Sequence, residues 1–273
     1  SEDLRIDYSI RDQHAESYRK IRNTFRYLLG NIKDNFEEID FKKVDLNELP
    51  ELEQFMLHKL YSLDVNFKKY FKNYDFHNLY KELLNFCTVD LSAFYFDIRK
   101  DSLYCDSIDS KNRKSTILLL NIILNSLLKW FAPILSFTTE EIYRLIFKDS
   151  KSVHLEKFLN FPNNFENKKL YQKWLELIKI RNICNISIEE QRANKEIGSS
   201  LEADLNIHLN KKLEEITKNI DFSELCITSK AQIFFKEKLE TSAQTTKAKG
   251  TKCTLCWKIS ENACDRTHCP KNT

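Results

Sequence analysis

The chain has 273 residues, of which 42% are hydrophobic and 30% are charged, and its formal net charge is +3. This composition is ordinary for a globular protein, and no apolar run approaches the roughly 20 residues that a membrane-spanning helix needs. Only three glycines occur, Gly30, Gly198 and Gly250, and they are too far apart to form a glycine-rich loop around a phosphate. The chain therefore has no Walker or dinucleotide-binding loop, and we expect it to carry out no nucleotide chemistry by itself.

Residues 1–147 are predicted to form an antiparallel bundle of helices, because apolar side chains recur there every three or four residues. After the first helix, a second is expected to follow a cap at Asp45 or Asn47, and a long amphipathic run begins at the cap residue Asp75. Within that run Asp90 interrupts the apolar stripe, which predicts a carboxylate that joins packed helices rather than a general acid.

Residues 116–131 are so apolar that they predict a central helix buried on most sides. Pro133 ends this helix, and Thr138 or Thr139 is expected to begin a short one. The polar stretch that follows, which includes Pro162 and several asparagines, predicts a connector.

A helix and a small α+β module are predicted beyond this connector. Residues 201–209 alternate apolar and polar side chains, as a half-buried strand does, and residues 225–227 and 231–235 are also β-like. Residues 241–250 are rich in threonine, serine, alanine, lysine and glutamine, which predicts a flexible tether.

Four of the eight cysteines and a histidine crowd the end of the chain, at Cys253, Cys256, Cys264, His268 and Cys269. Two thiolates separated by two residues on a tight turn can hold one tetrahedral zinc ion, and a second pair of soft ligands closes such a site. The second pair is either Cys264 with Cys269 or a pair in which His268 replaces one of them, and we favour the four-cysteine set. So short a tail cannot fold by burying apolar surface, so a metal would have to order it.

These patterns give a mainly α fold class: an antiparallel helical bundle, then a small α+β module and a short zinc-knuckle tail. The predicted segments are 1–147 for the bundle, 148–166 for the connector, 167–240 for a helix plus the α+β module, 241–250 for the tether and 251–273 for the zinc-binding tail.

The remaining cysteines are scattered and are predicted to be buried small hydrophobic residues: Cys87, Cys105, Cys184 and Cys226. Because the first residues are charged, we expect no secretory signal, and so many cysteines then indicate a reducing compartment, the cytoplasm.

Arg19, Arg22 and Arg26 lie on one stripe of the first helix, with Asn23 at its flank. Guanidinium groups supported by a packed core can contact phosphates or stack on a base. The alternative is a solvated face with local ion pairs. Lys195 lies at the predicted end of a later helix, where the helix dipole by itself favours a cation.

The last residues are cationic, since residues 247–273 hold six basic and two acidic side chains. A cationic metal-binding tail favours a polyanionic partner, and the alternative is a solvated end. Trp257, directly after the first cysteine pair, can shelter the metal or stack on an unpaired base. Every candidate ligand is a thiolate or one histidine, so no open position remains for a metal-bound water, which argues against a metal-dependent hydrolase.

Five segments, in this order along the chain, resemble bacterial-type isoleucyl-tRNA synthetases. They are YRKIRNTFRYLLGN at 18–31, the segment 80–105 with NFCTVDLSAFY at 85–95, APILSFTTEE at 132–141, RANKEIGSSLEA at 192–203 and KCTLCW at 252–257. Any one of them alone would be weak, whereas five in order over nearly the whole chain are specific.

The resemblance implies a C-terminal fragment with an anticodon-binding domain and a zinc-binding tail. The family joins isoleucine to its tRNA using ATP and magnesium in an upstream catalytic domain, whose motifs are missing here, so the fragment is expected to be inactive alone. Its expected role is to bind the anticodon stem-loop of isoleucine tRNA, as a monomer that binds neither DNA nor a membrane. The expected tRNA-contacting residues are Arg19, Arg22, Asn23, Arg26, Lys195 and Trp257.

The family's zinc ligands form two Cys-x-x-Cys pairs, and this tail departs from that pattern. Cys253 and Cys256 match the first pair and Cys269 matches the start of the second, but Asn272 stands at the last position. Two alternatives follow: Cys264 or His268 substitutes for the missing cysteine, or the metal site is degenerate. Two other functions remain as alternatives: a zinc-knuckled helical scaffold for protein interactions, and the same domain of a valyl-, leucyl- or methionyl-tRNA synthetase.

Overall fold

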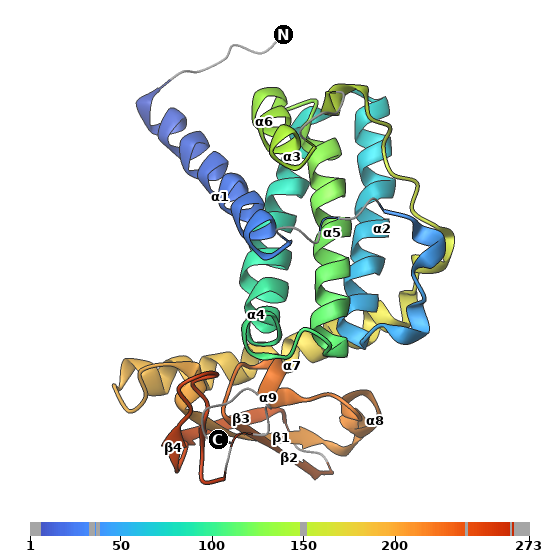
Figure 1. The fold of residues 1–273 in the computed structure, drawn as a ribbon. Helices are drawn as coiled ribbons and strands as arrows, with labels where there is room; N and C mark the ends of the chain where they lie inside the picture. The colour runs from blue at the N-terminus through green and yellow to red at the C-terminus, as the bar shows by residue number, and fades with distance from the viewer. Residues whose placement is uncertain are drawn as a thin grey trace. The chain divides into compact units, whose positions relative to one another are not determined.

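The computed structural model describes residues 7–32, 36, 39–147, 152–237, 240–262 and 264 (Figure 1). The chain forms two compact units: a helical unit of residues 1–99 and 111–166, and a mixed unit of residues 100–110 and 167–273. The mixed unit thus includes a short segment, 100–110, that the sequence pattern places in the bundle. Among the described residues, no helix is both long enough and apolar enough to cross a membrane.

The helical unit is built around α5, the central helix that the sequence predicts. Its helices are α1 (Tyr8–Ile32), α2 (Glu51–Lys72), α3 (Phe76–Asn85), η4 (Phe86–Tyr95), α4 (Phe96–Cys105, which runs on into the mixed unit), α5 (Lys111–Phe131) and α6 (Ser136–Ile146). Short 3-10 turns complete it, at η2 (Phe41–Lys43), η3 (Leu46–Glu48), η5 (Val153–Leu155) and η6 (Asn163–Phe165). Helix α5 contacts α1, α2 and α6 and is buried along most of its length, as expected (Figure 1).

Helix starts follow local hydrogen bonding, and two of them differ from the prediction. Asp75 caps α3 as expected, because its side chain accepts a hydrogen bond from the Asn78 backbone N–H. Asp45 caps only the 3-10 turn η3, and α2 begins later, after Pro50. Helix α6 begins at Ser136 rather than at a threonine, because Thr139 lies inside the first turn and its hydroxyl donates back to the Leu135 carbonyl.

The amphipathic run after Asp75 is not one regular helix, because the ten residues of η4 form a π-helix between α3 and α4. Asp90, on this π-helix, forms an ion pair with Lys59 of α2, which agrees with its predicted helix-packing role.

A buried hydrogen-bond network joins α2 to η4 and α4. Glu53 of α2 accepts hydrogen bonds from the Tyr95 hydroxyl (2.9 Å) and from Arg99 Nε (2.7 Å) and Nη2 (2.6 Å). These bonds compensate the cost of burying the carboxylate and the guanidinium.

The mixed unit joins a long helix, α7 (Lys168–Ala193), to a three-stranded sheet in the order β2-β1-β3. Its strands are β1 (Ala203–Asn210), β2 (Lys230–Lys236) and β3 (Ser242–Lys247), and short turns η7 (Ser200–Glu202), η8 (Lys211–Leu213), α8 (Glu214–Thr217) and α9 (Phe222–Leu225) connect them. Strand β1 pairs parallel with β2 and antiparallel with β3, and α7 packs on β3 and β1. The predicted strands at 201–209 and 231–235 are confirmed as β1 and β2.

Two expectations for this unit are wrong. Residues 225–227 are not β-like, because Asp221 caps the short helix α9 and Ile227 takes a left-handed φ of 57° after it. The tether expected at 241–250 contains strand β3 instead. Its inward-facing residues are small or polar, such as Thr245, whose hydroxyl lies 2.9 Å from that of Ser187 on α7. A strand without large apolar side chains carries no alternation that the sequence could reveal.

Candidate nucleic-acid and metal-binding sites

The predicted RNA-contacting residues of α1 form one solvent-exposed group, the arginine face, which consists of Arg19, Arg22, Asn23 and Arg26. The opposite stripe of the helix is fully buried at Ile21, Phe25 and Leu28. Spacings of three and four residues place side chains on one side of an α-helix, so the apolar stripe that docks α1 also orients the arginines outward.

Arg22 is held in place by side chains of its own unit. Its Nη2 and Nη1 atoms lie 2.9 and 3.0 Å from the two carboxylate oxygens of Glu141 on α6, and Nη1 also donates to the Tyr18 hydroxyl at 3.2 Å. The hydrogen bond to Glu141 is the main cause that raises the pKa of Arg22 and lowers the pKa of Glu141. Such a bidentate pair is geometrically specific, so Arg22 joins α1 to α6 and has fewer donors left for a ligand.

The other members of the arginine face are less constrained. Arg19 forms an ion pair with Glu16 one turn earlier, and exposed pairs of this kind contribute little to stability. Within the described residues, the side chains of Asn23 and Arg26 form no hydrogen bond or ion pair. Arg26 therefore offers a full set of guanidinium donors to a ligand.

Three of the four predicted metal ligands come together. The sulfur atoms of Cys253, Cys256 and Cys264 all lie within 4.8 Å of one another. A tetrahedral zinc ion with Zn–S distances of about 2.3 Å separates its sulfurs by about 3.8 Å, so these three thiols fit three positions of a zinc site. The fourth predicted ligand, Cys269, and its alternative, His268, lie outside the described residues.

A short hairpin builds the first half of this cluster. Strands β4 (Thr251–Lys252) and β5 (Ile259–Ser260) pair around the turn that holds the first two cysteines, and we call residues 251–260 the cysteine hairpin. The Cys253 N–H donates to the Lys258 carbonyl (2.9 Å), and the Leu255 N–H points to the Cys253 sulfur (3.4 Å). An N–H group directed at a sulfur stabilises a thiolate there, as a metal ligand requires.

The Cys256 thiol by itself resists ionisation, however. Burial is the main cause that raises the pKa of the Cys256 thiol to about 12. A dication in the cluster would reverse this balance, because metal coordination deprotonates a thiol outright.

Gly250 lies directly before the cysteine hairpin, where the backbone of Ser260 approaches it closely. Its φ is +118°, and a Cβ atom there would lie 2.2 Å from the Ser260 carbonyl carbon. Only glycine combines this backbone angle with so close an approach of the neighbouring strand.

Cys105 lies against the cysteine hairpin, which local sequence reasoning does not reveal. It is half-buried at the end of α4, within the mixed unit, and its thiol donates to the Leu255 carbonyl at 3.6 Å. From the sequence alone it is expected to be one of the scattered hydrophobic cysteines. The two residues are 150 positions apart in the chain, so only the fold brings Cys105 to the cluster.

Lys195 and Trp257 are both exposed in the mixed unit. Lys195 has a φ of 61° where α7 ends, and its N–H donates to the Arg192 carbonyl at 3.0 Å. Trp257 is 60% exposed, and the Lys252 ammonium lies 5.9 Å from its ring centroid. Lys252 in turn pairs with Glu202 at 3.5 Å.

The same Glu202 links this hairpin to the segment that follows Lys195. Its carboxylate accepts a hydrogen bond from the Gly198 N–H at 3.0 Å, which is the main cause that lowers the pKa of Glu202. Two segments that resemble the synthetase family separately in the sequence, 192–203 and 252–257, are thus bonded to each other.

Known proteins resemble this chain over almost its whole length. Residues 53–221 match a family model described as the anticodon-binding domain of tRNA ligase. The isoleucine–tRNA ligase of Pelagibacter ubique is 66% identical over 266 residues, covering 97% of this chain and 29% of that protein. Those of Bartonella henselae and Agrobacterium fabrum are 38% and 37% identical over 273 and 270 residues, covering 96% and 94% of this chain and 28% and 27% of those proteins. The chain spans less than a third of the length of these relatives.

Proposed function

We propose that this chain binds the anticodon stem-loop of an isoleucine tRNA, because it belongs to the family of anticodon-binding domains of tRNA ligases. The match of residues 53–221 carries this proposal, and the relatives named isoleucine–tRNA ligase support the choice of tRNA. In the same proposal the ligation of isoleucine, with ATP and magnesium, belongs to the rest of a longer protein. We also expect a monomer in the cytoplasm that binds neither DNA nor a membrane.

The arginine face supplies the cations for the stem. Arg26 and Asn23 are open to solvent, so they are the members that can meet phosphates or loop bases without first breaking a contact. Arg19 has only a local partner to exchange. Arg22 would act mainly by holding α1 against α6, because Glu141 already occupies one edge of its guanidinium group.

The cysteine cluster supplies a structural metal site in this proposal. Zinc bound by Cys253, Cys256 and Cys264, with Cys269 as the expected fourth ligand, would cross-link the end of the chain. The hairpin would then present Trp257 for stacking on an unpaired base. Lys195 would contact the RNA backbone from the exposed end of α7.

The test is a titration of the full chain with an isoleucine tRNA transcript and with a copy whose anticodon is swapped, at two salt concentrations. Affinity should fall with rising salt, because phosphate contacts release counterions, and it should be higher for the correct anticodon. Equal affinity for both transcripts would exclude anticodon recognition, and no binding at either salt concentration would favour the scaffold alternative.

Arg26→Ala sharpens the test. We expect it to lower affinity for both transcripts and to flatten the salt dependence by about one counterion. The matched control is Arg11→Ala, on the same helix but about 22 Å away, which should leave binding unchanged.

A further inference from the structure

The three-stranded sheet has two chemically different faces. On β1 the residues Ala203, Leu205, Ile207 and Leu209 are all fully buried. Side chains alternate across a strand, so the residues between them point to the other side, which we call the open face.

Strand pairing arranges the open face in cross-strand rows. The rows are Asp204 with Lys230 and Thr246, Asn206 with Gln232 and Gln244, His208 with Phe234 and Ser242, and Asn210 with Lys236. The residues from β2 and β3 in these rows are exposed and those from β1 are half-exposed. The open face is therefore polar, and its residues on β2 and β3 are in contact with solvent, whereas one carboxylate oxygen of Asp204 on β1 is buried.

An aromatic pair lies in the middle of this polar surface. The His208 and Phe234 rings are stacked, with centroids 5.3 Å apart and an angle of 24° between their planes. Phe234 is 42% exposed. A phenylalanine on the solvent side of a sheet adds nothing to the core, whereas a flat exposed ring is the surface on which an unpaired base stacks.

The neighbours of the aromatic pair fit a nucleotide. The amides of Asn206, Gln232 and Gln244 form the adjacent row, and each amide offers both donors and an acceptor to a base edge. Lys230 and Lys236 stand at the two ends of β2, about 20 Å apart at strand spacing, where they can meet phosphates.

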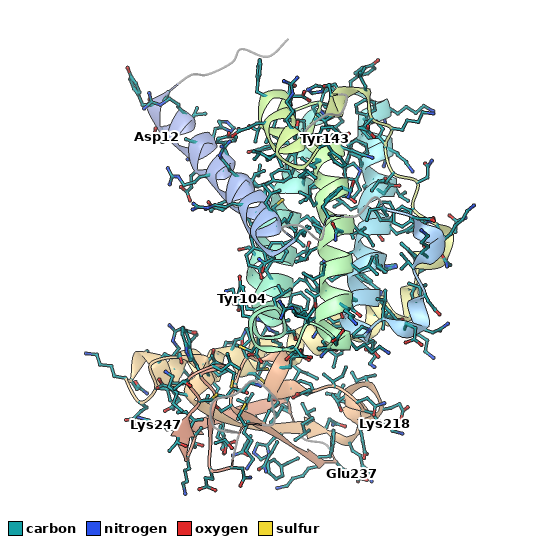
Figure 2. The ribbon with its side chains drawn as sticks, viewed as in Figure 1. Asp12, Tyr104, Tyr143, Lys218, Glu237 and Lys247 are labelled. Carbon is teal, nitrogen blue, oxygen red and sulfur yellow. The ribbon has the colours of Figure 1, made fainter. Side chains whose placement is uncertain are left out.

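Charge and the scarcity of exposed apolar side chains favour RNA over a protein partner. The rows hold the two lysines against a single acid, Asp204, which suits a polyanion. The open face offers only one large exposed apolar side chain, Phe234, whereas the centre of a stable protein interface is apolar and depleted of charge. In Figure 2, Glu237, which follows β2, and Lys247, the last residue of β3, lie at opposite ends of the sheet because β2 and β3 run in opposite directions.

We propose that the open face of the sheet binds unpaired RNA nucleotides, with one base stacked on the His208–Phe234 pair, amide contacts from the row at Asn206 and phosphate contacts from the lysines of β2. This inference deepens the proposed function. It rests on the proposed function for the identity of the RNA, a tRNA with an unpaired anticodon loop. It adds a contact surface separate from the arginine face and from Trp257.

The test compares two matched variants of the full chain. Phe234→Leu removes the exposed ring from the open face, and Phe137→Leu makes the same change at a 93% exposed phenylalanine in the helical unit. Each is titrated with three probes: the isoleucine tRNA transcript, a ten-residue oligouridine and an RNA duplex of the same length. Thermal unfolding of each variant checks that the fold is intact.

We expect Phe234→Leu to weaken binding of the tRNA and of the oligouridine at least about fivefold, the low end of the effect of one stacked base. It should leave duplex binding unchanged, and Phe137→Leu should behave as the parent chain does. Oligouridine carrying 4-thiouridine should also cross-link to peptides that contain β1 or β2.

Two outcomes overturn the inference, and they differ from a failure of the proposed function. If the parent chain prefers the correct anticodon but Phe234→Leu binds the tRNA and the oligouridine as tightly as the parent chain does, the open face is not an RNA contact. Cross-links confined to α1 would also exclude the open face. If instead the parent chain ignores the anticodon while Phe234→Leu still weakens oligouridine binding, the proposed function fails and the open face stands as a binder of single-stranded RNA.

Discussion

The helical unit and the cysteine hairpin are held together by different means. Helix α5 is surrounded by apolar side chains from its neighbours, so the bundle carries its own hydrophobic core. At the hairpin, the buried cluster in the described part of the chain consists of Cys253 and Cys256, with Cys105, Leu255 and Cys264 packed against it. The helical unit is thus stabilised by buried apolar area, whereas the hairpin belongs to a region in which three clustered cysteines could bind a metal ion.

The most severe test of this contrast is to remove the metal ligands. Structural zinc contributes apparent binding free energies on the order of 10–16 kcal/mol, so Cys253→Ser should lose the metal and unfold the hairpin while the helices persist. We expect lost zinc content and fast hydrogen exchange over residues 251–262, with an unchanged helical circular dichroism signal. The matched control, Cys184→Ala, removes a buried thiol in α7 and should keep its zinc. A hairpin that stays protected in the presence of a strong chelator would contradict the metal-dependent account.

The helical unit should respond most to the loss of its buried ion pair. Glu53→Ala removes the carboxylate that Tyr95 and Arg99 share in the core, and breaking such a pair costs about 3–5 kcal/mol. Urea unfolding followed by circular dichroism measures the effect. The double variant Glu53→Met with Arg99→Met should recover most of the loss, because it leaves no buried charge behind. A single variant as stable as the parent chain would show that this network is dispensable.

A smaller effect is expected at the entry to the hairpin. Gly250→Ala places a Cβ atom 2.2 Å from the Ser260 backbone at a φ of +118°, and strain of this kind costs about 1–3 kcal/mol. Zinc affinity, measured against a competing chelator, should fall accordingly. Gly30→Ala is the control, since a Cβ atom on this helical glycine meets nothing within 4 Å and should leave zinc affinity unchanged. Equal affinities in the two variants would refute the role assigned to Gly250.

The smallest effect concerns the contact that holds α1. Arg22 lowers the pKa of Glu141 below its ordinary value of 4.5, so the carboxylate stabilises the fold above pH 4.5 and loses this contribution as pH falls through the lowered pKa. Glu141→Gln should therefore lower the melting temperature slightly at pH 7, and the difference from the parent chain should vanish at lower pH. Melting curves between pH 7 and pH 3 measure it, and a difference that does not change with pH would exclude an ionic origin.

The helical bundle could be predicted from the sequence because its pattern is local. Apolar spacing identified α5, and the side chain of Asp75 identified the start of α3. The π-helix η4 was missed, because apolar spacing over ten residues does not separate a π-helix from an α-helix. Strand β3 was missed for a related reason: it pairs with β1 through its backbone and carries small or polar side chains.

The candidate sites divide in the same way. Spacing alone predicts the candidate metal ligands Cys253, Cys256 and Cys264, since residues close in sequence must also be close in space. By itself the sequence determined the helical class, the cysteine cluster and the outward row of arginines, because each depends on residues a few positions apart. Only the tertiary structure decided that Glu141 holds Arg22, that Cys105 packs against the hairpin and that His208 stacks on Phe234. These contacts join distant segments, and their geometry is set by how the helices and strands pack rather than by any local pattern.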